Sequence, residues 1–193
     1  METALSIGLG LGLSAACGFR VFVPLLVLGV AAATGQVSLA SGFEWLASIP
    51  ALIVLSIATL TEIVAYYVPW LDNLLDTVAS PTAVVAGVVA MASLMTDADP
   101  VFQWAVAVIA GGSVAGLGQL TTATLRAVST AMSAGLGNPL VASLELAVAL
   151  GLSLLTIALP VVALLVVALL LTALVVFVLR RRATRVAVGT AGG

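Results

Sequence analysis

Residues 139–179 read PLVASLELAVALGLSLLTIALPVVALLVVALLLTALVVFVL, and Glu145 is the single charged residue among them. As one α-helix this stretch would be about 60 Å long, whereas the hydrocarbon core of a bilayer is about 30 Å thick. A turn is therefore expected, and Pro160 is the best position for it, because proline lacks the N–H that a continuing helix needs. The stretch predicts two membrane-crossing helices, at 139–159 and 160–179.

The chain as a whole is also rich in hydrophobic residues and poor in charged ones. Of its 193 residues 63% are hydrophobic and 7% are charged, whereas soluble domains carry roughly a quarter charged residues. This composition predicts an all-α, polytopic transmembrane bundle, with lipid as its main solvent. Charges, prolines and turn residues divide residues 1–185 into about six spans in one domain. The expected spans are 4–33, 49–69, 81–96, 101–124, 139–159 and 160–179; the third is short, and the tail 186–193 is expected to be disordered.

The residue inventory excludes several kinds of chemistry. The chain has no histidine, and Cys17 is its only cysteine. Histidine is the usual general base near neutral pH and the commonest metal ligand, so an enzyme, a metal site or a bound cofactor is not expected. With so few charges, nucleic acid is not an expected partner either. The expected partners are the lipid bilayer, a small solute or ion, and a second copy of the chain.

Arginine positions predict the orientation in the membrane. A cluster follows the last predicted span, and positively charged loops stay in the cytoplasm. Counting back through six crossings from this cytoplasmic end places the N-terminus in the cytoplasm as well. The external loops then contain acids and no arginine. The cluster is Arg180, Arg181, Arg182 and Arg185, and the external acids are Glu44, Asp97 and Asp99.

Arg20 lies in the middle of the first apolar run, where a charge costs about 2.5 to 3.5 kcal/mol. Pro24 follows four residues later and leaves the Arg20 carbonyl without its helical partner, and Gly18 loosens the same turn. The first helix is therefore expected to be kinked or interrupted. Interrupted helices at mid-membrane indicate a transporter binding site; the alternative is that Arg20 only snorkels or pairs with an acid.

Two further acids lie inside predicted spans. Glu62 is the expected ion-pair partner of Arg20, and it could instead hold a proton, as carboxylates do in coupled transporters. Glu145 lies two turns into the span that begins near Asn138, which we expect to cap that helix, and Pro139. Arg20, Glu62 and Glu145 are thus the candidate buried functional charges.

The predicted inner face carries two candidate sites. The polar stretch with Arg126, Ser129, Thr130 and Asn138 could form a gate or hold an anion at a helix N-terminus, or it could be an ordinary capped loop. Asp72 and Asp76, one turn apart on a short amphipathic helix, could bind a divalent cation, pair with Arg126 or simply be solvated.

A weak internal repeat is visible in the order of these features. In each half of the chain a glycine-rich helix leads to an arginine, Arg20 or Arg126, and then to a span with a glutamate, Glu62 or Glu145. Three spans followed by three would give halves of opposite orientation, as in many transporters.

Several short motifs resemble a known family. They are Cys17-Gly18-Phe19-Arg20-Val21-Phe22-Val23-Pro24, Glu62-Ile63-Val64-Ala65, Pro69-Trp70-Leu71-Asp72, Leu75-Asp76-Thr77, Arg126-Ala127-Val128-Ser129-Thr130 and Gly137-Asn138-Pro139. In this order, over roughly residues 4 to 160, they resemble DUF4126, a family of bacterial membrane proteins of unknown function. The resemblance implies the bacterial plasma (inner) membrane as location. It implies no activity, and Gln119 and Thr122 stand where family members carry His and Lys.

Three functions remain open. A small transporter or channel would use Arg20 and Glu62 at mid-membrane. A structural or assembly protein would use the same buried charges only to fix helix packing. An enzyme acting on lipid phosphates would need Asp72 and Asp76 to hold a cation, and without histidine this is the least favoured of the three.

Overall fold

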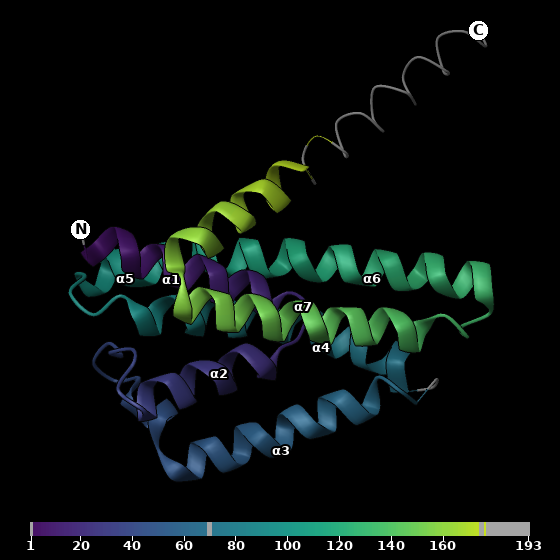
Figure 1. Ribbon diagram of the computed structural model, residues 1–193, viewed down its shortest axis with the longest axis horizontal. Helices are drawn as coiled ribbons and strands as arrows, with labels where there is room; N and C mark the ends of the chain where they lie inside the picture. The colour runs from purple at the N-terminus through teal and green to yellow at the C-terminus, as the bar shows by residue number, and fades with distance from the viewer. Residues whose placement is uncertain (1, 69–70, 174–175, 177–193) are drawn as a thin grey trace, which may run out of the picture.

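The computed structural model describes the backbone of residues 2–68, 71–173 and 176, and the side chains of 4–68, 79–173 and 176. Within these residues the fold is an all-α bundle (Figure 1). Its elements are α1 (Glu2–Cys17), α2 (Phe22–Ala33), the 3₁₀ turn η1 (Glu44–Ala47), α3 (Ile49–Ala65), α4 (Leu71–Leu94), α5 (Pro100–Val106), the π-helical segment η2 (Ala107–Gly112), α6 (Ser113–Ser133), α7 (Asn138–Ala158) and a last helix, Pro160–Ala173.

The first apolar run folds back on itself. Instead of one crossing helix over 4–33, α1 and α2 form a hairpin that begins and ends at the same end of the bundle (Figure 1). Ile7 near the start of α1 and Phe43 after α2 pack on one hydrophobic cluster around Met95. The backbone N–H of Ala40 also reaches the Ser93 carbonyl, 2.8 Å away at the end of α4. The sequence left open whether this run crosses the membrane once or turns back; in the structure the expected interruption, at Gly18–Val21, is the tip of a hairpin.

Local sequence signals explain where other helices begin. Ser48 caps α3 by accepting the Ala51 N–H at 3.3 Å, with Pro50 in the first turn. Asp99 caps α5 in the same way, because its side chain accepts the Val101 N–H at 2.9 Å. Pro100 follows it as the first residue of the helix. Both follow the rule that a short polar side chain satisfies the free N–H groups of a first turn, where proline is also tolerated.

Two helices extend beyond their predicted limits. α4 begins at Leu71 rather than 81, so Asp72 and Asp76 belong to its first turns and not to a separate surface helix. The helix expected to end at 124 continues from Pro100 to Ser133, because the threonines that make its second half polar also allow helical structure. Inside it, η2 takes up one residue more per turn than an α-helix.

The corner at Pro160 is confirmed. α7 ends at Ala158, Leu159 leaves the helical region with φ −139° and ψ 72°, and a new helix runs from Pro160 to Ala173. This last helix leaves α7 at a sharp angle and runs obliquely back over the bundle (Figure 1). The arginine cluster and the tail 186–193 lie outside the described residues.

The hairpin tip is packed directly against the middle of the helix Pro100–Ser133. A Cβ atom placed on Gly18 would lie 2.7 Å from the Ala115 carbonyl oxygen and 2.8 Å from the Cα of Gly118. No real side chain tolerates such distances to backbone atoms. Glycines at this crossing let two backbones touch, as small residues do in membrane helix pairs.

We expect Gly18→Ala to destabilise the protein by roughly 1 to 3 kcal/mol, because the added methyl must push the hairpin tip away from the backbone of α6. The melting temperature in detergent, followed by tryptophan fluorescence, measures this loss. Gly151→Ala is the matched control, since a Cβ there meets nothing within 4 Å, and it should be neutral or slightly stabilising. Equal melting temperatures for the two variants would contradict the close crossing.

Two helices of the described residues are long and apolar enough to cross a membrane, Pro100–Ser133 with 34 residues and Asn138–Ala158 with 21. By itself this is weak evidence for association with a membrane, since core helices of soluble proteins pass the same test.

Candidate functional site

The hairpin tip leaves two backbone N–H groups without a partner in its own chain segment. After α1 ends, the N–H groups of Gly18, Phe19 and Arg20 turn back to the carbonyls of Ala15 and Ala16. At the start of α2, the N–H groups of Val21 and Phe22 precede any helical acceptor, as the first N–H groups of every helix do. Pro24 stands in this same first turn, where its missing N–H costs nothing.

Glu62 of α3 supplies the missing acceptors. Its Oε1 accepts the Val21 N–H at 2.8 Å and its Oε2 accepts the Phe22 N–H at 3.1 Å. The carboxylate thus caps the positive end of the α2 dipole from a neighbouring helix. Glu62 was expected to pair with Arg20, and the structure does not place these two side chains in an ion pair; the carboxylate is used by the helix start instead.

Arg20 points from the hairpin tip towards α7. Its Nη2 donates to the Ala142 carbonyl oxygen at 2.8 Å and lies 3.7 Å from Oε2 of Glu145. The residue is 1% exposed, yet its Nε and Nη1 have no hydrogen-bond acceptor among the described residues. A buried donor without an acceptor costs about 1 to 3 kcal/mol, and more for a charged group. Such a cation requires water or an anion.

Glu145 joins two arginines from different halves of the chain. Its Oε1 accepts from Nε of Arg126 at 3.1 Å, and its Oε2 forms a second contact with Nη2 of the same guanidinium. Oε2 also faces Arg20. Both ends of the Arg126–Glu145 pair are buried, and the two-point geometry is the strong form of an arginine–carboxylate contact. Arg20 and Arg126, which start the two halves of the proposed repeat, therefore meet at one carboxylate.

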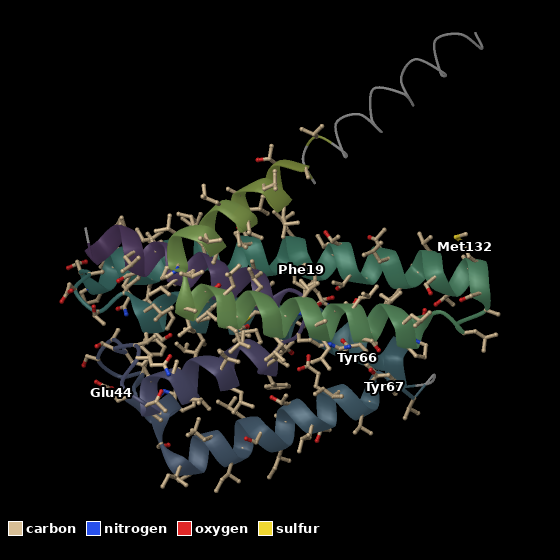
Figure 2. All side chains as sticks on the ribbon, in the orientation of Figure 1. Phe19, Glu44, Tyr66, Tyr67 and Met132 are labelled. Atoms are coloured by element: carbon tan, nitrogen blue, oxygen red, sulfur yellow. The ribbon has the colours of Figure 1, made fainter. Side chains whose placement is uncertain are left out.

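Tyr66 is the site residue that sequence reasoning missed. The guanidinium carbon of Arg20 lies 4.0 Å from the Tyr66 ring centroid, and that of Arg126 lies 3.8 Å from it. Figure 2 shows Tyr66 at the end of α3, on the side that faces α7. A tyrosine near a span end usually lies at the membrane surface, but this ring is buried and contacts two guanidinium cations through its π system. The exposed Tyr67 bonds to Ser143 of α7 at 2.8 Å.

The predicted inner-face region divides into two parts. Arg126 turns inward, whereas Thr130 and Asn138 bond to each other at the surface turn between α6 and α7, with 3.0 Å from Asn138 Nδ2 to Thr130 Oγ1. Asn138 does not cap α7 as expected, because Gly137 occupies that position. The Ser129 carbonyl accepts the Ser133 hydroxyl at 2.7 Å. This part has the hydrogen bonds of a structured turn.

Asp72 and Asp76 are placed in the backbone of α4, and their side chains lie outside the described residues. Among the described side chains, no three histidines, cysteines or acids lie close enough to hold a metal ion. Gln119 and Thr122 are both buried on α6, and Nε2 of Gln119 also lacks a described partner.

A cavity of about 280 Å³ lies beside the α2 start. Glu62 and Tyr66 line it together with apolar side chains and two threonines from α2, α3 and α4: Val21, Phe22, Ala58, Thr61, Ala79 and Thr82. The volume corresponds to about nine water molecules at their liquid density. A small ligand can therefore approach the capping carboxylate without any rearrangement of helices.

Comparisons with known proteins give one result. Neither the curated proteins nor the solved structures that were compared contain a match to this chain. The family model described as "Domain of unknown function (DUF4126)" matches residues 7–181, which include most of α1, all of α2 and every residue of the site. The chain therefore belongs to the DUF4126 family.

Proposed function

We propose that this chain is an integral protein of the bacterial plasma membrane that moves a small solute, with the α1–α2 hairpin tip as its binding site. Its exposed surface supports the membrane location. Ile53, Ile57, Leu60 and Val64 form one exposed apolar stripe along α3. Such a surface is unstable in water and is the normal lipid-facing surface of a membrane helix.

The hairpin changes the proposed orientation. Because α1 starts and α2 ends at one end of the bundle (Figure 1), the N-terminus lies at the end where α5 also begins, directly after Asp99, and where Figure 2 shows Glu44. With the arginine cluster kept in the cytoplasm, the N-terminus is then external and five helices cross the membrane: α3, α4, α5–α6, α7 and the last helix. Arg126, the other arginine among the described residues, then lies in the cytoplasmic half.

One observation supports transport above the other functions: the buried hairpin tip carries an arginine with two unsatisfied nitrogen atoms, Nε and Nη1. Irregular backbone at membrane depth is tolerated where it is covered by protein or lines a cavity, and in transporters such broken helices hold the substrate. An arginine that served only to fix packing would be expected to have all its donors satisfied.

The test is solute movement into liposomes that contain the purified protein. Labelled chloride, lactate and methylamine represent an inorganic anion, an organic anion and a cation. We expect at least one to enter faster than into empty liposomes, and Arg20→Gln to abolish the difference. Glu44→Gln, which changes an exposed acid outside the hairpin tip, should move the solute at the wild-type rate.

Folding must be controlled, so each variant is compared only when it elutes as a single species in detergent. If the wild type moves none of the three solutes, or if folded Arg20→Gln retains full movement, the proposed function is wrong.

The second candidate is a structural or assembly protein. It is favoured by the charges that are buried among the described side chains, two arginines and two glutamates, which compensate one another when all are ionised. It predicts no solute movement, and a neutral double substitution of a buried pair that restores stability.

A further inference from the structure

The cavity between α2, α3 and α4 has a negatively charged wall. Glu62 is the only charged residue among the described residues that line it. Arg20 and Arg126 are not among these residues, and their guanidinium groups lie on the ring of Tyr66. Each also contacts Glu145 on α7. A ligand in the cavity therefore meets a carboxylate directly, and this wall favours a ligand with a positive charge.

The Glu62 carboxylate has acceptor positions left for such a ligand. Its two oxygens accept one backbone N–H each, from Val21 and from Phe22. A carboxylate offers about four acceptor positions, so about two are not used by these N–H groups. The residue is 5% exposed and lines the cavity, so a donor reaches these positions from inside the cavity. An N–H donor with a positive charge makes the strongest hydrogen bond there.

Thr61 adds a second acceptor to the same wall. Its hydroxyl donates to the Ile57 carbonyl oxygen at 2.8 Å, so its oxygen offers lone pairs and not a proton to a ligand. Thr61 lies next to Glu62 in α3, and both line the cavity. Two neighbouring acceptors match a group with several N–H donors, such as a primary ammonium group, which has three.

The rest of the wall sets the size and shape of the ligand. Val21, Phe22, Ala58 and Ala79 make it largely apolar. Divalent cations take about six oxygen ligands or more, which such a wall does not supply. The cavity volume of about 280 Å³ lies just below the range of about 300 to 1,000 Å³ that is typical of small-molecule pockets. The cavity thus fits a small organic cation better than a bare metal ion.

We propose that this cavity is a binding site for a short-chain primary amine in its protonated form. The ammonium group donates to the Glu62 carboxylate and to the Thr61 hydroxyl oxygen, and the alkyl chain packs on Val21 and Phe22. No covalent bond changes. The inference goes beyond the proposed function, because it concerns binding and does not require that the amine crosses the membrane.

The test is calorimetric binding of propylamine to the full-length protein in detergent, at neutral pH and constant ionic strength. Propylamine is protonated under these conditions, as the lysine amine is. We expect saturable binding. Propanol has a similar shape without the charge, and propionate has the opposite charge. Both should bind at least about tenfold more weakly, since each lacks the charged N–H donors that the carboxylate needs.

Two substitutions in the cavity test the two parts of the argument separately. Glu62→Gln removes the charge and should weaken propylamine binding by roughly tenfold or more. Ala58→Leu leaves the carboxylate and its hydrogen bonds in place and fills the cavity with a larger side chain, so it should abolish binding. This second variant keeps the proposal testable if Glu62→Gln does not fold.

Matched controls lie outside the cavity. Ala131→Leu makes the same change in size at an exposed position of α6, and Glu44→Gln removes an exposed carboxylate. Both should bind propylamine as the wild type does.

Two results overturn the inference: no saturable binding of propylamine by the wild type, or folded Ala58→Leu that binds it as tightly as Ala131→Leu does. The liposome assay keeps the two proposals apart. If propylamine binds as expected but no solute enters liposomes, the amine site stands and the proposed transport function is wrong. If propylamine does not bind but chloride or lactate enters in an Arg20-dependent way, the transport function stands and the amine site is wrong.

Discussion

Replacing Glu145 with alanine is expected to destabilise the protein by roughly 3 to 5 kcal/mol, which is the usual cost of breaking a buried ion pair by removing one partner. The reason is specific to this site. Glu145 contacts two guanidinium groups, those of Arg126 and Arg20, and all three side chains are almost fully buried. Without it, two cations remain close together in an apolar bundle. The midpoint of thermal unfolding in detergent measures the effect.

A double substitution tells whether the pair is needed for stability at all. Arg126→Met combined with Glu145→Leu removes both charges and keeps similar volumes, and such replacements are often neutral or stabilising. We expect the double variant to recover most of the stability lost in Glu145→Ala. If the double variant recovers stability and also moves solute normally, the Arg126–Glu145 pair serves packing alone. That result would favour the second candidate function, a structural or assembly protein.

Tyr66→Leu is expected to cost roughly 2 to 4 kcal/mol, because the ring stabilises two desolvated cations and each such contact contributes about 2 kcal/mol. Leucine fills part of the space but has no π face. Unfolding midpoints in detergent measure this loss as well, and solute movement should fall with it, since Arg20 loses the ring on which its guanidinium lies.

Two further variants separate the effect of the Tyr66 ring from that of an ordinary tyrosine contact. Tyr66→Phe keeps the ring and should retain the larger part of the stability. Tyr67→Leu removes an exposed tyrosine next to it, with one hydrogen bond to Ser143, and should change stability by less than about 1 kcal/mol. A Tyr66→Leu variant as stable as Tyr67→Leu would show that the two guanidinium contacts contribute nothing.

Local signals were sufficient for two breaks between helices, although α4 and the helix Pro100–Ser133 extend beyond their predicted limits. The proline at 160 marked a corner, and Gly18, Arg20 and Pro24 marked an interruption, because each of these residues acts on the backbone next to it. What the interruption produces depends on the rest of the fold. Whether a broken helix continues across or turns back is decided by packing, here by the contact of Gly18 with Gly118, which lies a hundred residues away in the sequence.

The partners of the buried charges were not predictable for the same reason. The sequence identified Arg20, Glu62, Arg126 and Glu145 because charge in an apolar run is costly. It offered Glu62 as partner of Arg20 because both lay in neighbouring spans. The structure uses Glu62 on backbone N–H groups and shares Glu145 between the arginines. Tyr66 gave no signal of its own, since a tyrosine near a span end usually marks the membrane surface.

The π-helical segment Ala107–Gly112 has a consequence for how this protein can change over evolution. Each residue turns a helix by about 100°, so the extra residue held in this segment sets the rotation of everything that follows it. Loss of one residue there would restore a regular α-helix but would rotate Gly118 and Arg126 away from Gly18 and Glu145. Insertions and deletions should therefore accumulate in the connection between α2 and η1 and be rejected between Pro100 and Arg126.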